Sequence, residues 1–183
     1  MNTFSIQMSL AGSILSKRDV ALALAEQIEN TIPRDAALIL HFAGVQIATT
    51  SFLDELLLRL RVLVHISDSS MLIVVGGMDD AVAETMELVL GQRKLALATV
   101  TKNQIELLGG TRLLAKTFEA ASRLATFTAT ELADELKVKL PDLRQRLDAL
   151  LEVGAVTREP YETVEGGKRY RFRAPSKKLV ETV

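Results

Sequence analysis

Three hydroxyl side chains, those of Thr49, Thr50 and Ser51, stand together where a strongly apolar segment begins. A hydroxyl at the amino end of a helix accepts a hydrogen bond from a free backbone N–H, and the positive helix end also favours a phosphate there. Asp54 follows Ser51 at the spacing of a capping box. We therefore expect Ser51 mainly to cap this helix. Phosphate acceptance by Ser51 is the alternative, and the negative charges of Asp54 and Glu55 oppose it.

The rest of the chain offers little for catalysis or for metal binding. It has no cysteine, which excludes disulfides, thiolate nucleophiles and thiolate zinc sites. Its two histidines, His41 and His65, lack a second ligand at helical or hairpin spacing, so we interpret both as structural. No glycine-rich segment ends in the Lys-Ser or Lys-Thr of a phosphate loop. We expect a protein that is not an enzyme and that holds neither a metal nor a cofactor.

Composition narrows the class of protein further. Of the 183 residues, 48% are hydrophobic, which is enough for a substantial core. The net charge of −1 argues against nucleic-acid binding through bulk charge alone. No apolar run approaches the roughly 18 residues of a membrane span, and the first residues lack a basic region before their apolar part. We expect a cytoplasmic protein that does not bind membranes.

Helices and strands alternate over the first hundred residues. Near-continuous apolar runs at 37–45, 71–77 and 95–100 are typical of strands that are buried on both faces. Amphipathic or capped segments precede, separate and follow them, starting near residues 17, 51 and 79. This order predicts an α/β fold with a largely parallel or mixed sheet that helices cover.

The pattern changes after about residue 105. A helix is followed by a Thr128/Glu131 capping box, a second helix, and a third helix that Pro141 opens and Gly154 ends. A hairpin around Gly166-Gly167 completes the order of a winged helix-turn-helix. We therefore predict two domains, a sheet domain over 1–104 and a small α+β winged-helix domain over 105–183.

The first hundred residues also resemble a known family. The segments "GSILSKRDVALALAEQI", "LILHFAGVQIATTSFLDELL" and "MLIVVGG" are similar to the STAS superfamily of anti-sigma factor antagonists, and more narrowly to its STAS-like domain family. The resemblance implies a protein-interaction domain whose partner is a kinase-like ATPase, and it aligns Ser51 with the serine that antagonists carry phosphorylated. The antagonist pattern Asp-Ser-Ser-Gly-Leu reads Thr-Thr-Ser-Phe-Leu at 49–53.

The helix after Ser51 has apolar residues on two faces. At 100° per residue, one broad arc should pack on the sheet, namely Leu53, Leu56, Leu57, Leu60, Leu63 and Val64. Leu58 and Val62 lie on the opposite arc, one turn apart. An apolar centre with a charged rim suits a protein interface. We predict a partner-binding surface formed by Asp54, Glu55, Leu58, Arg61 and Val62; cover by the second domain, or chance, is the alternative.

The winged helix supplies the candidates for nucleic-acid binding. On its third helix Gln145 points outward between Arg144 and Arg146, but two acids share that outward face. In the wing Arg169, Arg171 and Arg173 alternate with Tyr170 and Phe172, so the arginines should share one strand face while the aromatics pack inward. Lys177 and Lys178 follow. A two-residue turn at Gly166-Gly167 would place Glu162 opposite Arg171, and phosphate binding and self-pairing are equally open.

Two hypotheses of function result. The first is a non-enzymatic regulatory protein in signalling or transcription control, whose STAS-like domain binds a protein partner and whose winged helix makes a second contact. The second is a DNA-binding transcriptional regulator whose STAS-like domain senses a ligand or forms a homodimer.

Overall fold

The computed structural model describes the chain except residues 69, 102–103, 163–167, 177–178 and 180–183. The first part contains β1 (Thr3–Gln7), the short 3-10 helix η1 (Met8–Ala11), β2 (Ile14–Leu15), α1 (Arg18–Thr31), β3 (Ala37–His41), β4 (Ile47–Ala48), α2 (Thr50–Ile66), β5 (Leu72–Gly76), α3 (Asp80–Arg93), β6 (Ala96–Thr101) and β7 (Gln104–Gly109). The second part contains α4 (Arg112–Leu124), β8 (Thr126–Thr128), α5 (Ala129–Leu136), α6 (Leu140–Glu152), β9 (Thr157–Glu162) and β10 (Lys168–Arg173).

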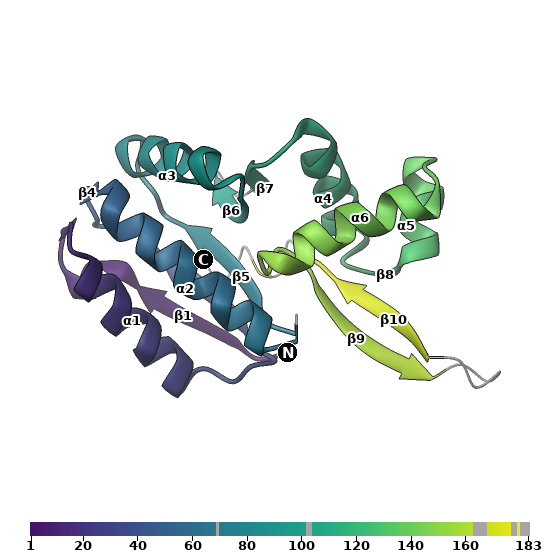
Figure 1. Ribbon diagram of the computed structural model, residues 1–183, viewed down its shortest axis with the longest axis horizontal. Helices are drawn as coiled ribbons and strands as arrows, with labels where there is room; N and C mark the ends of the chain where they lie inside the picture. The colour runs from purple at the N-terminus through teal and green to yellow at the C-terminus, as the bar shows by residue number, and fades with distance from the viewer. Residues whose placement is uncertain (69, 102–103, 163–167, 177–178, 180–183) are drawn as a thin grey trace.

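Five strands form the main sheet, in the order β1-β3-β5-β6-β7. The first four are parallel, and β7 runs antiparallel to β6, which confirms the predicted α/β fold with a mixed sheet. The parallel strands advance in one direction, so right-handed connections place α1, α2 and α3 on the same face. Figure 1 shows α1 and α2 side by side, with α3 at the upper end of α2. The sheet continues through β7 to Gly109, beyond the division expected after residue 104.

Side chains that alternate along the strands form two cores. On the face toward α1–α3, Leu38, Leu40, Ile73 and Val75 pack with the helices. The predicted inner arc of α2 is confirmed, because all six of its aliphatic residues are buried. A strand that is buried on both faces needs apolar residues at every position, as β5 has.

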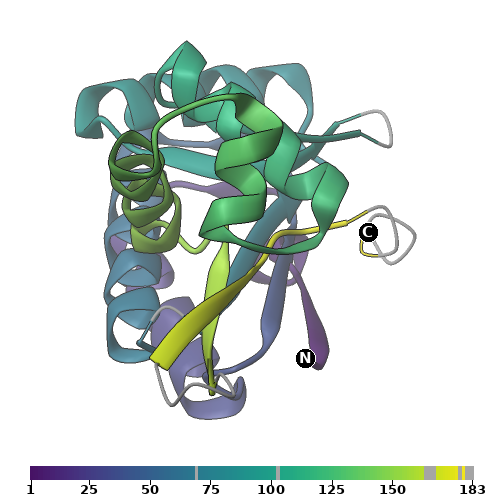
Figure 2. The same cartoon turned by 90° about the vertical axis from the view of Figure 1, so that its right-hand side faces the viewer.

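The winged-helix part covers the other face of the sheet. Ala37, Leu72, Val74 and Ala98 share one core with buried residues of α4, α5, α6 and the wing. Figure 2 shows these helices and the wing lying in front of the sheet strands. The sheet therefore lies between α1–α3 on one face and the winged-helix part on the other. The winged-helix part shares a core with the sheet face that it covers.

Local sequence explains how the winged helix forms. Thr128 and Glu131 make the predicted capping box, in which the Glu131 carboxylate accepts from the backbone N–H of Thr128 at 2.7 Å. The Thr128 hydroxyl donates to the same carboxylate at 3.0 Å, and the two hydrogen bonds lower the pKa of Glu131. Gly154 has a positive φ of 68°, and its carbonyl accepts from the N–H of Ile73 at 2.8 Å. The turn after α6 is thus bonded directly to β5.

The wing is a three-stranded antiparallel sheet in the order β8-β10-β9. Its register differs from the predicted one, because Arg171 lies opposite Glu159 and Glu162 lies opposite Lys168. The predicted turn at Gly166-Gly167 lies outside the described residues. The prediction that both aromatics of β10 pack inward is wrong for Tyr170, which is exposed, whereas Phe172 is buried against Phe127. Within the described part of the chain, no helix is long and apolar enough to cross a membrane.

Candidate interaction surface between α2 and α6

Thr49, rather than Ser51, caps α2. The Thr49 hydroxyl accepts from the N–H of Phe52 at 3.4 Å and donates to the carbonyl of Ser16 at 3.1 Å. Ser51 lies inside the first turn of the helix and is exposed. The prediction that Ser51 is the cap is therefore wrong. The helix begins earlier than expected, because Thr49 has the extended backbone of a cap residue and Thr50 is already helical.

The two acids of the first turns belong to an ion-pair cluster that joins three helices. Arg93 of α3 holds Asp54 through two hydrogen bonds of 2.6 and 2.8 Å, and Arg18 of α1 approaches both Asp54 and Glu55 at 3.4 Å. Glu55 also pairs with Arg59 at 2.8 Å. The hydrogen bonds from Arg93 lower the pKa of Asp54. Asp54 is thereby engaged with α3 and does not complete a capping box with Ser51.

Further along α2, Leu58 and Val62 line a groove that α6 borders. They are 43% and 46% exposed. The groove has a volume of about 580 Å³, and its walls are formed by Leu58, Arg61, Val62, Val64 and His65 of α2, Asp148, Leu151 and Glu152 of α6, and Arg158 of β9. The second part of the chain therefore borders these two aliphatic side chains and leaves both accessible.

Charges of both signs surround this apolar centre. Arg61 forms an ion pair with Glu152 across the groove. Arg158 lies over the ring of Tyr170, with 5.1 Å between its Cζ and the ring centroid, and approaches Asp68 at 3.4 Å. An apolar floor with a charged rim is the composition of a transient protein interface.

The candidates for nucleic-acid binding on α6 are only partly available. Arg144 and Gln145 are exposed, but Arg146 is half-buried and donates to the Thr117 hydroxyl at 3.4 Å. Asp148 and Glu152, on the same helix, face the α2 groove. The negative charges beside α6 oppose the approach of DNA phosphates.

The three wing arginines share one strand face, as their spacing predicts. Arg169 is exposed. The Cζ of Arg171 lies 5.1 Å from the ring centroid of Tyr161, and Arg173 pairs with Glu159 at 3.0 Å. Lys177 and Lys178 lie outside the described residues. Two of the three arginines are therefore engaged within the wing.

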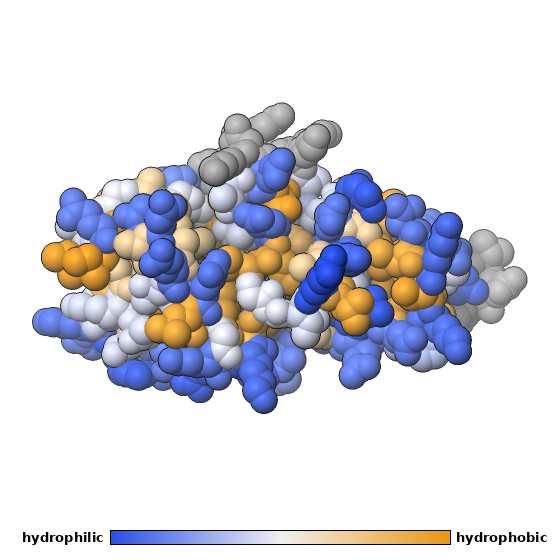
Figure 3. All heavy atoms as spheres, turned by 90° about the horizontal axis from the view of Figure 1, so that it is seen from above, coloured by the Kyte–Doolittle hydropathy of each residue, from blue (hydrophilic) through white to orange (hydrophobic). Residues whose placement is uncertain are grey.

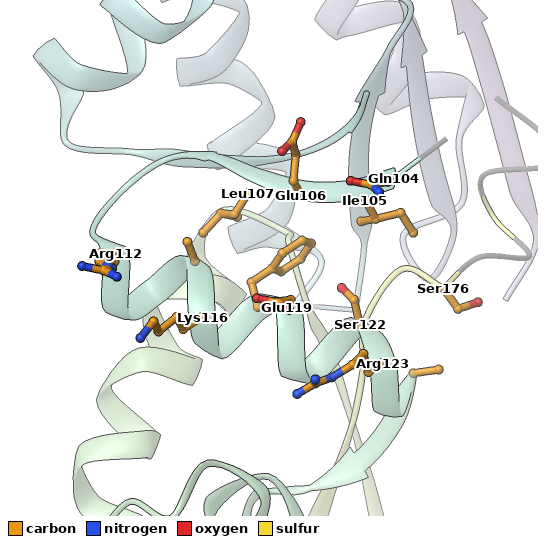
Figure 4. Close-up of a pocket in the computed structure, with 13 residues that line it drawn as sticks. Gln104, Ile105, Glu106, Leu107, Arg112, Lys116, Glu119, Ser122, Arg123 and Ser176 are labelled. Atoms are coloured by element: carbon orange, nitrogen blue, oxygen red, sulfur yellow. The ribbon is translucent and has the colours of Figure 1, made fainter. Parts of the chain in front are cut away.

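A second, larger groove was missed by the sequence reasoning. It lies between β7 and α4 and has a volume of about 1030 Å³ (Figure 4). Seen from above, apolar surface extends across the middle of the molecule between charged side chains (Figure 3). The amphipathic pattern of α4 is visible in its sequence, but the groove also needs β7, which was not predicted as a strand.

No group of three or more His, Asp or Glu side chains is placed to hold a metal among the residues that the structure describes. His41 ends β3, where its Nδ1 accepts from the N–H of Ala43 at 3.3 Å. The fold and the α2–α6 groove together define a mixed α/β protein with an attached winged helix and an accessible interhelical surface. No known protein family and no curated protein matches this chain.

Proposed function

We propose that this chain is a non-enzymatic regulatory protein that binds a protein partner through the α2–α6 groove. The observation that carries the proposal is the pair of accessible aliphatic residues, Leu58 and Val62, beside charged residues of both signs. The winged helix contributes the α6 wall of this groove and thus makes the second contact. The resemblance of the first hundred residues to STAS-like domains supports a signalling or transcription-control role, with a kinase-like ATPase as the expected class of partner.

The ion-pair cluster at the start of α2 supports a fixed presentation of this surface. Asp54 is joined to Arg93 of α3 and to Arg18 of α1, so the helix is held at its amino end. Its other end is joined to α6 through Arg61 and Glu152. A groove whose walls are already in place loses little conformational entropy when a partner binds.

The DNA-binding alternative draws its support from the wing alone. Arg169 and Arg171 are exposed on one strand face and suit phosphate contacts, although Arg171 also lies over the ring of Tyr161. The acids Asp148 and Glu152 oppose an approach of DNA along α6. This alternative requires duplex binding that weakens steeply with salt and that is lost after Arg169→Ala and Arg171→Ala.

The experiment that tests the proposal replaces the apolar centre of the groove. The double variant Leu58→Gln/Val62→Gln should lose the partner that tagged wild-type protein retains from its native host, as quantified by mass spectrometry. Leu88→Gln is the matched control, because Leu88 is 53% exposed on α3 and lies outside the groove. The control should retain the partner, and both variants should keep the wild-type unfolding midpoint. Equal retention by the double variant would refute the proposal, and unfolding of that variant would show that the two residues act as core.

A further inference from the structure

We propose that the groove between β7 and α4 binds an extended peptide of a partner protein, which adds a sixth strand to the sheet at β7. This site is separate from the α2–α6 groove and does not depend on its function. Its walls come from Gln104–Leu107 of β7, from one face of α4 between Arg112 and Arg123, and from Ala125 and Ser176. The proposal rests on the strand edge, on the shape of the groove and on its charge.

The strand edge supplies main-chain hydrogen-bonding groups. Among the residues that the structure describes, β7 is the last strand of the sheet and pairs only with β6. In an antiparallel pair, the N–H and C=O groups of alternate residues point away from the partner strand. No backbone hydrogen bond joins Gln104–Gly109 to any other described element. The outward groups of β7 are therefore oriented to pair with an added strand.

The dimensions of the groove suit such a strand. β7 has six residues and α4 has thirteen, so each is about 20 Å long. Figure 4 shows that they run side by side, with Arg112 near the Leu107 end and Arg123 near the Gln104 end. A helix beside a free strand edge is the arrangement in which proteins bind short extended peptides by strand addition.

The side chains along the groove specify the peptide. Ile105 and Leu107 face the α4 side of the sheet, where Phe118 adds to the apolar floor. Arg112 and Lys116 lie at one end and Arg123 at the other, with the single acid Glu119 between them on α4, whereas Glu106 points away from α4 (Figure 4).

Alternate side chains of an added strand point to the same face. The side chains of peptide residues i, i+2 and i+4 should therefore point toward α4, and they should be acidic, apolar and acidic in that order. The residues between them face the side of Glu106, where basic residues fit. The resulting order acidic-basic-apolar-basic-acidic reads the same in both directions, so it suits either strand orientation.

The test uses blocked synthetic peptides and the isotope-labelled full chain, observed by NMR. The probe is Thr-Glu-Lys-Leu-Lys-Glu-Thr, and Thr-Lys-Glu-Leu-Glu-Lys-Thr is a control of the same composition. We expect the probe to shift the amide resonances of β7 and α4 in a saturable way, and the control to bind about ten-fold more weakly. The protein variant Arg112→Glu/Lys116→Glu should lose binding to a similar degree. Lys139→Glu/Arg144→Glu, which changes the net charge equally at the start of α6 and outside the groove, should bind the probe as wild type does.

Three further versions of the probe test strand addition itself. Two are N-methylated at every second residue, in complementary sets, and the third is N-methylated at every residue. The side chains of alternate residues are fixed toward α4, so the direction of the peptide decides which set of amides faces β7, and the set that weakens binding more identifies this direction. The third version should lose binding in either direction. Binding of the third version as strong as that of the unmodified probe would overturn the proposal, as would the absence of any shift at β7 at millimolar peptide. The proposal would also be overturned if the chain is a dimer whose β7 amides are already protected from exchange before peptide is added. A second copy would then fill the groove.

Discussion

Gly154 holds the turn after α6 against the sheet, and adding a single methyl group there should disrupt this contact. Its φ of +68° lies in the left-handed region, where a side chain costs roughly 1–2 kcal/mol. A Cβ would also lie 2.8 Å from Cγ2 of Val64 and 3.2 Å from both Cγ1 of Ile73 and the carbonyl oxygen of Met71. Val64 and Ile73 are buried and β-branched, so neither side chain can turn aside easily.

Overpacking of this kind costs about 1–3 kcal/mol, so Gly154→Ala should lower the free energy of unfolding by about 2–5 kcal/mol. Urea unfolding followed by circular dichroism measures the change, provided that the slope with denaturant stays constant. Gly91→Ala is the matched control, because no atom lies within 4 Å of its added Cβ and the residue is helical. That variant should gain about 0.5–1 kcal/mol. A Gly154→Ala protein as stable as wild type would refute the close packing of this turn on β5.

Two predictions concern the start of α2. Thr49→Ala should lower the free energy of unfolding by about 0.5–2 kcal/mol, whereas Ser51→Ala should stay within about 0.5 kcal/mol of wild type in the same urea titration; the reverse order would restore Ser51 as the cap. Asp54, whose pKa is lowered mainly by hydrogen bonds from Arg93, should stabilise the fold above its unfolded pKa, and that contribution should be lost as the pH falls through the lower folded value. Asp54→Asn should therefore remove up to about 1 kcal/mol at pH 7 and less near pH 3, and an equal loss at both pH values would show that the charge of Asp54 is not responsible.

The sequence determines the inner face of α2 because burial there follows helical periodicity alone. The choice of cap does not follow from spacing, since Thr49 and Ser51 both precede the apolar stripe. It depends on where the helix begins, and Asp54, the expected partner of Ser51, is taken by Arg93, 39 residues away. An ion pair between residues this far apart in sequence depends on how α3 packs against α2, and the local sequence around Asp54 does not predict that packing.

The strand β7 was missed for a related reason. Its sequence "QIELLG" alternates only weakly and leads into Gly109-Gly110, so it reads as the linker between two domains. Pairing with β6 decides its structure, with Leu97 opposite Leu108 and Ala98 opposite Leu107. The wing register was wrong because it assumed a two-residue turn, whereas the pairing of Lys168 with Glu162 leaves five residues between the strands.

The shared core also bears on how DNA could be bound. The winged helix and the sheet bury Phe118, Phe127 and Leu147 together with Ala37 and Val74, so α6 cannot leave the sheet without exposing this core. A duplex that received α6 in its major groove would have to accommodate α2 as well, because Arg61 of α2 is paired with Glu152 of α6. The wing projects away from the helices (Figure 1) and meets no such obstacle. Any phosphate contact should therefore depend on the wing arginines, while the acidic residues Asp148 and Glu152 of α6 face the groove that α2 lines.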